Sequence, residues 1–143
     1  MDWTNTTNFD AIIFDCDGTL SRLEGIDELA RMNHVYEPVK TMTQHAMSNG
    51  NLDITLYEQR LNLVKPSAAN IETLGQLYID ALTTNAASVM QTLLALGKAV
   101  YIVSAGIKQA ILPLADYLHI PSDNVFAVDI FFDEHHHYQN FDR

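Results

Sequence analysis

The chain has 143 residues, of which 48% are hydrophobic and 18% charged, and its formal net charge at pH 7 is −10. This length suffices for one modest domain and excludes two large ones, and the composition is that of an ordinary globular protein. Because phosphate backbones and anionic lipid surfaces attract basic proteins, the acidic balance argues against nucleic acids and membranes as partners.

The first predicted element is a buried strand over residues 10–14, and Asp15 and Asp17 follow its apolar run directly. Side chains two residues apart on a strand face the same way, and ligands bind at the carboxyl edge of open α/β sheets. Two carboxylates this close repel each other unless a cation lies between them or one stays protonated. We therefore predict that Asp15 and Asp17 share a divalent cation such as Mg²⁺, the alternative being an ordinary turn. Cys16 is expected to be a small buried residue with a raised pKa.

A helical block without a convincing strand is expected over residues 25–84. Apolar residues recur at helical spacing, and segments containing Gly or Pro divide the block. Predicted helices begin near Ile26 and cover 38–47, 53–64 and a segment after Ser67, which is predicted to cap it. Inserted directly after the first strand, the block would lie over the ligand site as a lid.

The second half of the chain alternates between helix and strand, which predicts an α/β sheet. Ser104, Ala105 and Gly106 are expected to turn the chain from the second strand into a helix, where a hydroxyl and backbone N–H groups can hold a phosphate oxygen. A plain helix N-cap is the alternative for Ser104. The expected elements are a helix over 86–96, a strand over 99–103, a helix over 107–118, and a hairpin of 125–132 with 138–141.

Two stretches of the chain resemble the motifs of a known enzyme family. The apolar run ending in Asp15 and Asp17 before a Gly-Thr turn resembles the first motif of the haloacid-dehalogenase-like (HAD) phosphatases, and Ser104, Ala105 and Gly106 resemble the second. The resemblance implies an α/β fold in which a Rossmann-like parallel-sheet core carries a small helical cap inserted after the first strand. The domains implied are a core of residues 1–24 and 85–143 and a cap of residues 25–84.

Within this family the chain is most similar to the phosphoserine phosphatase-like branch. Glu24 follows the first motif at the distance of a substrate-binding glutamate, Arg60 lies in a segment similar to one in the branch's cap, and residues 125–143 resemble its hairpin. A carboxylate suits an ammonium group and a guanidinium grips a carboxylate, so the pair suits an amino acid ester. Taken alone, Glu24 is equally well explained as a helix-start acid, and Arg60 as part of a solvated helix face.

The resemblance implies a Mg²⁺-dependent phosphatase that hydrolyses a small phosphorylated metabolite, with O-phosphoserine as the best guess. In that role Asp15 would be the nucleophile that becomes phosphorylated, and Asp17 the general acid and base. Both aspartates would hold the metal, whereas Ser104, Ala105 and Gly106 would bind the substrate phosphate.

Two parts of the family pattern are missing from this sequence: a lysine beyond the second motif and a later acidic strand end. Lys108 comes too early to be that lysine. We therefore expect the C-terminal part of the core to be missing, which would expose a sheet edge and favour self-association. Two alternatives stay open: a HAD-derived domain that binds a ligand or partner without turnover, and a HAD phosphatase or phosphotransferase for another ester. The lack of a signal peptide or membrane span predicts a cytoplasmic location.

Overall fold

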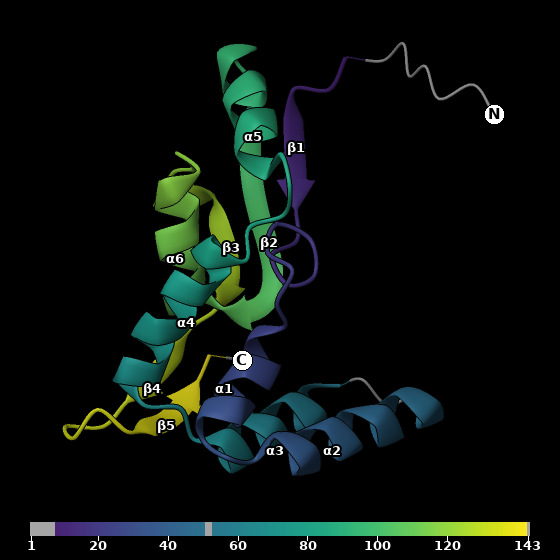
Figure 1. The fold of residues 1–143 in the computed structure, drawn as a ribbon, viewed down its shortest axis with the longest axis vertical. Helices are drawn as coiled ribbons and strands as arrows, with labels where there is room; N and C mark the ends of the chain where they lie inside the picture. Colours follow the sequence, from purple (N-terminus) through teal and green to yellow (C-terminus); the bar gives the residue numbers. More distant parts are fainter. Residues whose placement is uncertain (1–7, 51–52, 143) are drawn as a thin grey trace.

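The computed structural model describes residues 8–50 and 53–142 as an α/β fold with a parallel sheet of three strands in the order β1-β2-β3 (Figure 1). The strands are β1 (Ala11–Phe14), β2 (Ala99–Ile107), β3 (Val125–Val128), β4 (Ile130–Phe132) and β5 (Tyr138–Phe141). The helices are α1 (Gly25–Met32), α2 (Tyr36–Asn49), α3 (Ile54–Val64), α4 (Ala68–Asp80), α5 (Ala86–Ala95) and α6 (Lys108–Tyr117). None of the helices in the described part of the chain has the length and apolar content needed to cross a bilayer.

One face of the parallel sheet forms the core, and the other stays partly open. Val100 and Ile102 of β2 are buried, and Ile102 pairs with the buried Val125 of β3. On the opposite face Ile13 is 67% exposed and Phe126 is 56% exposed. The expectation of a buried first strand is therefore wrong: Ala11 and Ile13 are exposed and Ile12 and Phe14 are half-buried, because β1 is an edge strand whose second face the described residues leave open.

Helices α1, α2 and α3 gather beyond the carboxyl ends of β1 and β2, whereas α4 runs beside α6 (Figure 1). The predicted cap of α4 is confirmed, since the Ser67 hydroxyl accepts a hydrogen bond from the Asn70 amide and the Asn70 side chain accepts one from the Ser67 amide. Gly75 lets α4 approach α6 closely, because a Cβ there would lie 3.1 Å from Cγ of Pro113. The division into a core and a cap of residues 25–84 stays a prediction.

The structure corrects the expected ends of two strands. β2 continues to Ile107, so Ser104, Ala105 and Gly106 belong to an extended strand and the N-cap alternative for Ser104 is wrong. Pairing with β3 shifts between Val103 and Ile107, which marks an irregularity in this part of the strand. The single strand expected over residues 125–132 is divided at Asp129, because the chain there leaves its parallel partner β2 and pairs with β5 instead.

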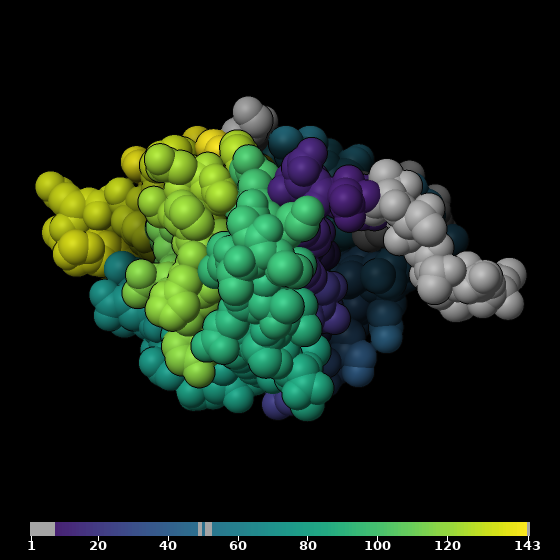
Figure 2. Space-filling view, turned by 90° about the horizontal axis from the view of Figure 1, so that it is seen from above, coloured from purple at the N-terminus to yellow at the C-terminus, as the bar shows by residue number. Residues whose placement is uncertain are grey.

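The predicted hairpin is formed by β4 and β5, and it projects from one side of the molecule (Figure 2). Its turn is held by the Asp133 carboxylate, which accepts hydrogen bonds from the amides of His135 and His137 at 2.9 Å each. The backbone carbonyl of His136 accepts a hydrogen bond from the Ala68 amide at the start of α4. The hairpin is therefore joined to the helical segment that follows β1.

Candidate active site

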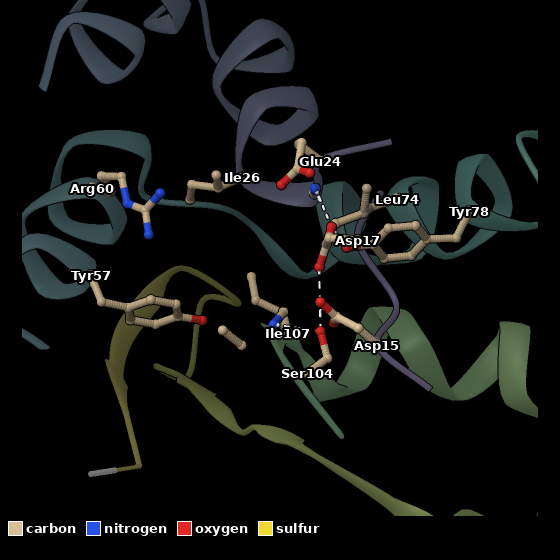
Figure 3. Close-up of a pocket in the computed structure, with 13 residues that line it drawn as sticks. Asp15, Asp17, Glu24, Ile26, Tyr57, Arg60, Leu74, Tyr78, Ser104 and Ile107 are labelled. Carbon is tan, nitrogen blue, oxygen red and sulfur yellow. Dashed lines mark hydrogen bonds between the residues drawn. The ribbon is translucent and has the colours of Figure 1, made fainter. Parts of the chain in front are cut away.

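A cavity of about 220 Å³ lies at the carboxyl ends of β1 and β2, beneath α1, α3 and α4 (Figure 3). All of the residues predicted to act on the substrate line it, together with six that the sequence reasoning did not single out. The predicted lining residues are Asp15, Asp17, Glu24, Arg60, Ser104, Ala105 and Gly106, and the additional ones are Gly25, Ile26, Tyr57, Leu74, Tyr78 and Ile107.

Asp15 is the first residue after β1, and its Oδ1 accepts a hydrogen bond from the Cys16 amide at 2.6 Å. The Cys16 side chain is fully buried, as predicted, and its pKa is raised, first by burial and then by Asp17 and Asp15. A thiol that stays protonated is a poor nucleophile, so Asp15 is the nucleophilic candidate in this turn.

Asp17 is held by three donors, two of which come from distant parts of the chain. Its Oδ1 accepts hydrogen bonds from the Gly25 amide at 2.6 Å and from the Tyr78 hydroxyl at 2.7 Å, and its Oδ2 accepts one from the Ser104 hydroxyl at 3.5 Å. Burial raises the pKa of Asp17, and the neighbouring Asp15 raises it further, although the three donors act in the opposite direction. Asp17 therefore keeps its proton to a higher pH than an exposed aspartate does, which suits a general acid.

The Asp17 carboxyl group and its Tyr78 donor fit into the site only because Gly25 and Gly106 have no side chains. A Cβ at Gly106 would lie 2.5 Å from Oδ2 of Asp17, and a Cβ at Gly25 would overlap the Tyr78 hydroxyl and lie 3.2 Å from Oδ1 of Asp17. Because atoms cannot approach so closely, side chains at either position would displace the carboxyl group or its donor.

We predict that Gly25→Ala destabilises the fold by about 1–3 kcal/mol, the usual cost of overpacking a closely packed site. In a Tyr78→Phe background the same substitution should cost less, because the overlapping hydroxyl is gone. Urea unfolding of the four proteins gives this double-mutant cycle. An equal cost in both backgrounds would contradict the overlap.

Glu24 and Arg60 approach the cavity from different elements. Glu24 precedes the first residue of α1, and its pKa is raised by burial and by the negative charge of Asp17, whereas Arg60 lowers it. Arg60 projects from α3, and its Nε is buried without a hydrogen-bond partner among the described residues. A buried guanidinium nitrogen without a partner is costly, so an acceptor from a ligand would satisfy it.

Ser104 is oriented by its own strand. Its Oγ accepts a hydrogen bond from the Gly106 amide at 3.0 Å, and its one hydroxyl hydrogen is donated to Oδ2 of Asp17 at 3.5 Å. The irregular end of β2 thus directs a hydroxyl donor toward the two aspartates.

The charges that line the cavity suit a divalent cation held by oxygen ligands. Three carboxyl groups, those of Asp15, Asp17 and Glu24, line it, and Arg60 is the only cationic side chain among its described lining residues. No cluster of three or more His, Cys, Asp or Glu side chains within residues 8–50 and 53–142 is arranged to hold a metal ion. Mg²⁺ is commonly bound by one or two carboxylates together with water and substrate phosphate, so Asp15 and Asp17 fit it.

Comparison with known proteins shows what the chain is similar to. No protein-family model matches the chain. It is 34% identical to phosphoserine phosphatase of Bos taurus over 133 residues, or 93% of this chain and 59% of the bovine protein. It is also 34% identical to phosphoserine phosphatase of Drosophila melanogaster over 131 residues, or 92% of this chain and 48% of the fly protein. The chain therefore spans about half the length of these relatives.

Solved structures show the same fold. A phosphoserine phosphohydrolase-like protein from Francisella tularensis matches with a TM-score of 0.81 and 26% identity over 94% of this chain and 65% of that one. A substrate-bound phosphoserine phosphatase matches with a TM-score of 0.77 and 26% identity over 95% of this chain and 63% of that one. These similarities support a phosphoserine phosphatase-like protein of the HAD superfamily. The resemblance and the α/β fold inferred from the sequence are confirmed.

Among the residues of this HAD protein that sequence reasoning missed, Tyr57 and Tyr78 bring polar groups to the cavity. Tyr57 lies one helical turn before Arg60, and that spacing alone would have placed both on one face of α3. Tyr78 lies in an apolar helical pattern typical of core residues, so no local signal marked its hydroxyl as a partner of Asp17.

Proposed function

We propose that this protein hydrolyses a small phosphomonoester, with O-phosphoserine as the best candidate, through a phosphorylated Asp15. The proposal rests on one observation: a single cavity contains two carboxyl groups, a hydroxyl at a strand end, Glu24 and Arg60. The relatives and solved structures that carry the name phosphoserine phosphatase support the same activity. The core of residues 1–24 and 85–143 and the cap of residues 25–84 are part of the proposal.

In the first half of the reaction, Asp15 attacks phosphorus and forms an aspartyl-phosphate while the ester bond breaks. Asp17, protonated at the start, gives its proton to the leaving alkoxide. The Ser104 hydroxyl, which in the structure donates to Oδ2 of Asp17 at 3.5 Å, would turn its hydrogen to a phosphoryl oxygen when substrate is bound. Backbone N–H groups near Gly106 would contribute to the same phosphate site, whereas that of Gly18 donates to the Leu23 carbonyl at 3.0 Å.

In the second half, Asp17 is a carboxylate and takes a proton from the water that attacks the phosphorylated Asp15. Inorganic phosphate leaves, Asp15 is regenerated as a carboxylate, and Asp17 is protonated again for the next turnover. When Mg²⁺ is bound, it supplies positive charge that offsets the charge of the phosphate and the surrounding carboxylates. The Asp15 carboxylate and, at Asp17, a backbone carbonyl would hold it, which leaves the Asp17 side chain free to act as the acid.

The alcohol part of the substrate would be recognised by Glu24 and Arg60. Glu24 offers a carboxylate to an ammonium group, and Arg60 offers a guanidinium whose buried Nε has no partner among the described residues. Such a pair suits an amino acid ester such as O-phosphoserine.

The test is phosphate release from O-phosphoserine in the presence of Mg²⁺, measured against a buffer control and against the same protein with excess chelator. Release that depends on both the protein and Mg²⁺ would support the proposal. Release of phosphate from an aryl phosphate but not from O-phosphoserine would point to a HAD phosphatase for another ester.

A second candidate function is binding of a phosphorylated ligand or a partner without turnover. It is favoured by the charges of the described lining residues, among which no lysine stands beside Asp15. Lys108, the first residue of α6, pairs with Asp129 at 3.8 Å and does not line the cavity. Binding of O-phosphoserine with no phosphate release from any ester would establish this second function. Self-association and a cytoplasmic location stay predictions.

We predict that Arg60→Ala raises KM for O-phosphoserine about tenfold or more with a smaller effect on kcat, because it removes a charge-assisted contact to the substrate carboxylate. Hydrolysis of an aryl phosphate without a carboxylate should change little. Steady-state kinetics on both substrates provide the measurement. If both suffered equally, Arg60 would not bind the carboxylate.

A further inference from the structure

Tyr57 brings a second hydrogen-bond donor to the end of the cavity where Arg60 lies. Both residues belong to α3 and are three positions apart, so they share one face of the helix. Cζ of Arg60 lies 5.8 Å from the centre of the Tyr57 ring. Figure 3 shows both side chains entering the cavity from the side opposite Asp17 and Ser104, with the Tyr57 hydroxyl directed inward.

The Tyr57 ring is held in place by the β4–β5 hairpin. The Phe141 ring of β5 packs against it with 5.2 Å between ring centres and an angle of 58° between the ring planes. Phe141 itself is only 4% exposed. This tilted packing is a favoured geometry for aromatic pairs. It fixes the direction of the Tyr57 hydroxyl through the ring and does not engage the hydroxyl in a hydrogen bond.

The Tyr57 hydroxyl keeps its hydrogen, and no described residue accepts a hydrogen bond from it. Within residues 8–50 and 53–142, it makes no hydrogen bond to another group. Burial raises its pKa, and the negative charge of Asp17 adds to this effect, although Arg60 opposes it. The phenol therefore stays protonated near neutral pH and can donate to a ligand.

The charges of the residues that line the cavity indicate which ligand group binds beside Arg60 and Tyr57. The remaining walls carry the carboxyl groups of Asp15, Asp17 and Glu24, which disfavour a second anionic group beside the phosphate. Arg60 is the only cation among the described lining residues, and its Nε lacks a partner. One charged and one neutral donor side by side match the two oxygens of a carboxylate.

We propose that Tyr57 determines specificity by donating its hydroxyl hydrogen to the substrate carboxylate that Arg60 also binds, at the end of the cavity away from Asp15. This assignment rests on the proposed function, because it takes the phosphate to lie beside Asp15 and Ser104. It selects phosphomonoesters whose alcohol part carries a carboxylate over those that lack one.

The test measures ligand binding to a variant that is expected not to hydrolyse its substrate. The result therefore does not depend on enzymatic activity. In the Asp15→Asn protein with Mg²⁺, the dissociation constants of O-phosphoserine and O-phosphoethanolamine are compared by calorimetry. The two ligands share the phosphate and ammonium groups and differ in the carboxylate. Adding Tyr57→Phe, which keeps the ring against Phe141, should weaken O-phosphoserine binding about tenfold and change O-phosphoethanolamine binding less than about twofold.

A second measurement needs no change at Tyr57. With ¹³C-labelled tyrosine Cζ atoms, O-phosphoserine should shift the Tyr57 resonance strongly, and O-phosphoethanolamine should shift it weakly. Equal weakening of both ligands by Tyr57→Phe, no weakening of either, or undetectable binding of O-phosphoserine would overturn the assignment. Phosphate release by the unchanged protein is measured separately, so failure of the proposed function is distinguishable from failure of this one.

Discussion

Replacing Asp15 with Asn is expected to lower phosphate release from O-phosphoserine by at least about 1000-fold, because removing a nucleophile leaves only binding and charge stabilisation to act. An amide nitrogen or oxygen cannot form the acyl phosphate that Asp15 is proposed to form. The substitution keeps the shape of the side chain and an oxygen that can accept the Cys16 amide hydrogen bond. The fold should therefore be retained, and initial rates with saturating substrate and Mg²⁺ provide the measurement.

Asp10→Asn is the matched control, since Asp10 is exposed, lies just before β1 and takes no part in the cavity. It makes the same change of charge on the same segment, and its rate should stay within about twofold of the unchanged protein, as for surface substitutions in general. Equal rates for Asp15→Asn and the unchanged protein would remove Asp15 from the chemistry. A loss of the same size for Asp10→Asn would show that net charge on the segment, and not the nucleophile, governs the rate.

The parts of the site that could be predicted from the sequence are those carried by local signals. An apolar run that stops at Asp15 and Asp17 indicates a strand end within a few residues, and parallel strands present their carboxyl ends at one edge of the sheet. Ser104, predicted to hold a phosphate oxygen, lies toward the carboxyl end of the neighbouring strand, and Figure 3 shows it near these aspartates. Helix ends with capping residues, such as Ser67, were likewise predictable from short segments.

The parts that could not be predicted depend on contacts between distant elements. Tyr78 reaches Asp17 only because α4 packs closely on α6, where Gly75 meets Pro113, and no local pattern encodes that approach. The extended backbone at Ser104 lies between the β3 pairings of Val103 and Ile107, and propensity alone does not reveal it. Exposure of Ile13 depends on which elements cover the sheet, whereas an apolar run only indicates that burial is favoured.

Asp17→Asn should lower phosphate release from O-phosphoserine by about 100-fold to 10,000-fold, the usual contribution of a general acid and base. The loss should be much smaller in the step that breaks an aryl phosphate, because a phenolate leaves readily without a proton. Single-turnover rates with O-phosphoserine and an aryl phosphate separate the two cases. Equal losses on both substrates would mean that Asp17 acts by charge or metal binding and not as an acid.

The same substitution is expected to stabilise the metal-free fold at neutral pH. Burial raises the pKa of Asp17 in the folded state above its unfolded value, so the folded protein binds this proton more tightly. Stability from this group is therefore present below the unfolded pKa and is lost as the pH rises through the folded pKa. An asparagine keeps an oxygen for the Gly25 and Tyr78 donors and never ionises, so it avoids that loss.

Urea unfolding with chelator present provides the measurement. The Asp17→Asn protein should be at least as stable as the unchanged chain at pH 7, with the difference shrinking toward pH values below about 4, where the aspartate is protonated in both the folded and the unfolded state. A loss of stability of the same size at pH 7 and at acid pH would show that folding does not raise the pKa of Asp17, and a larger loss at pH 7 would show that the carboxylate is favourably bound.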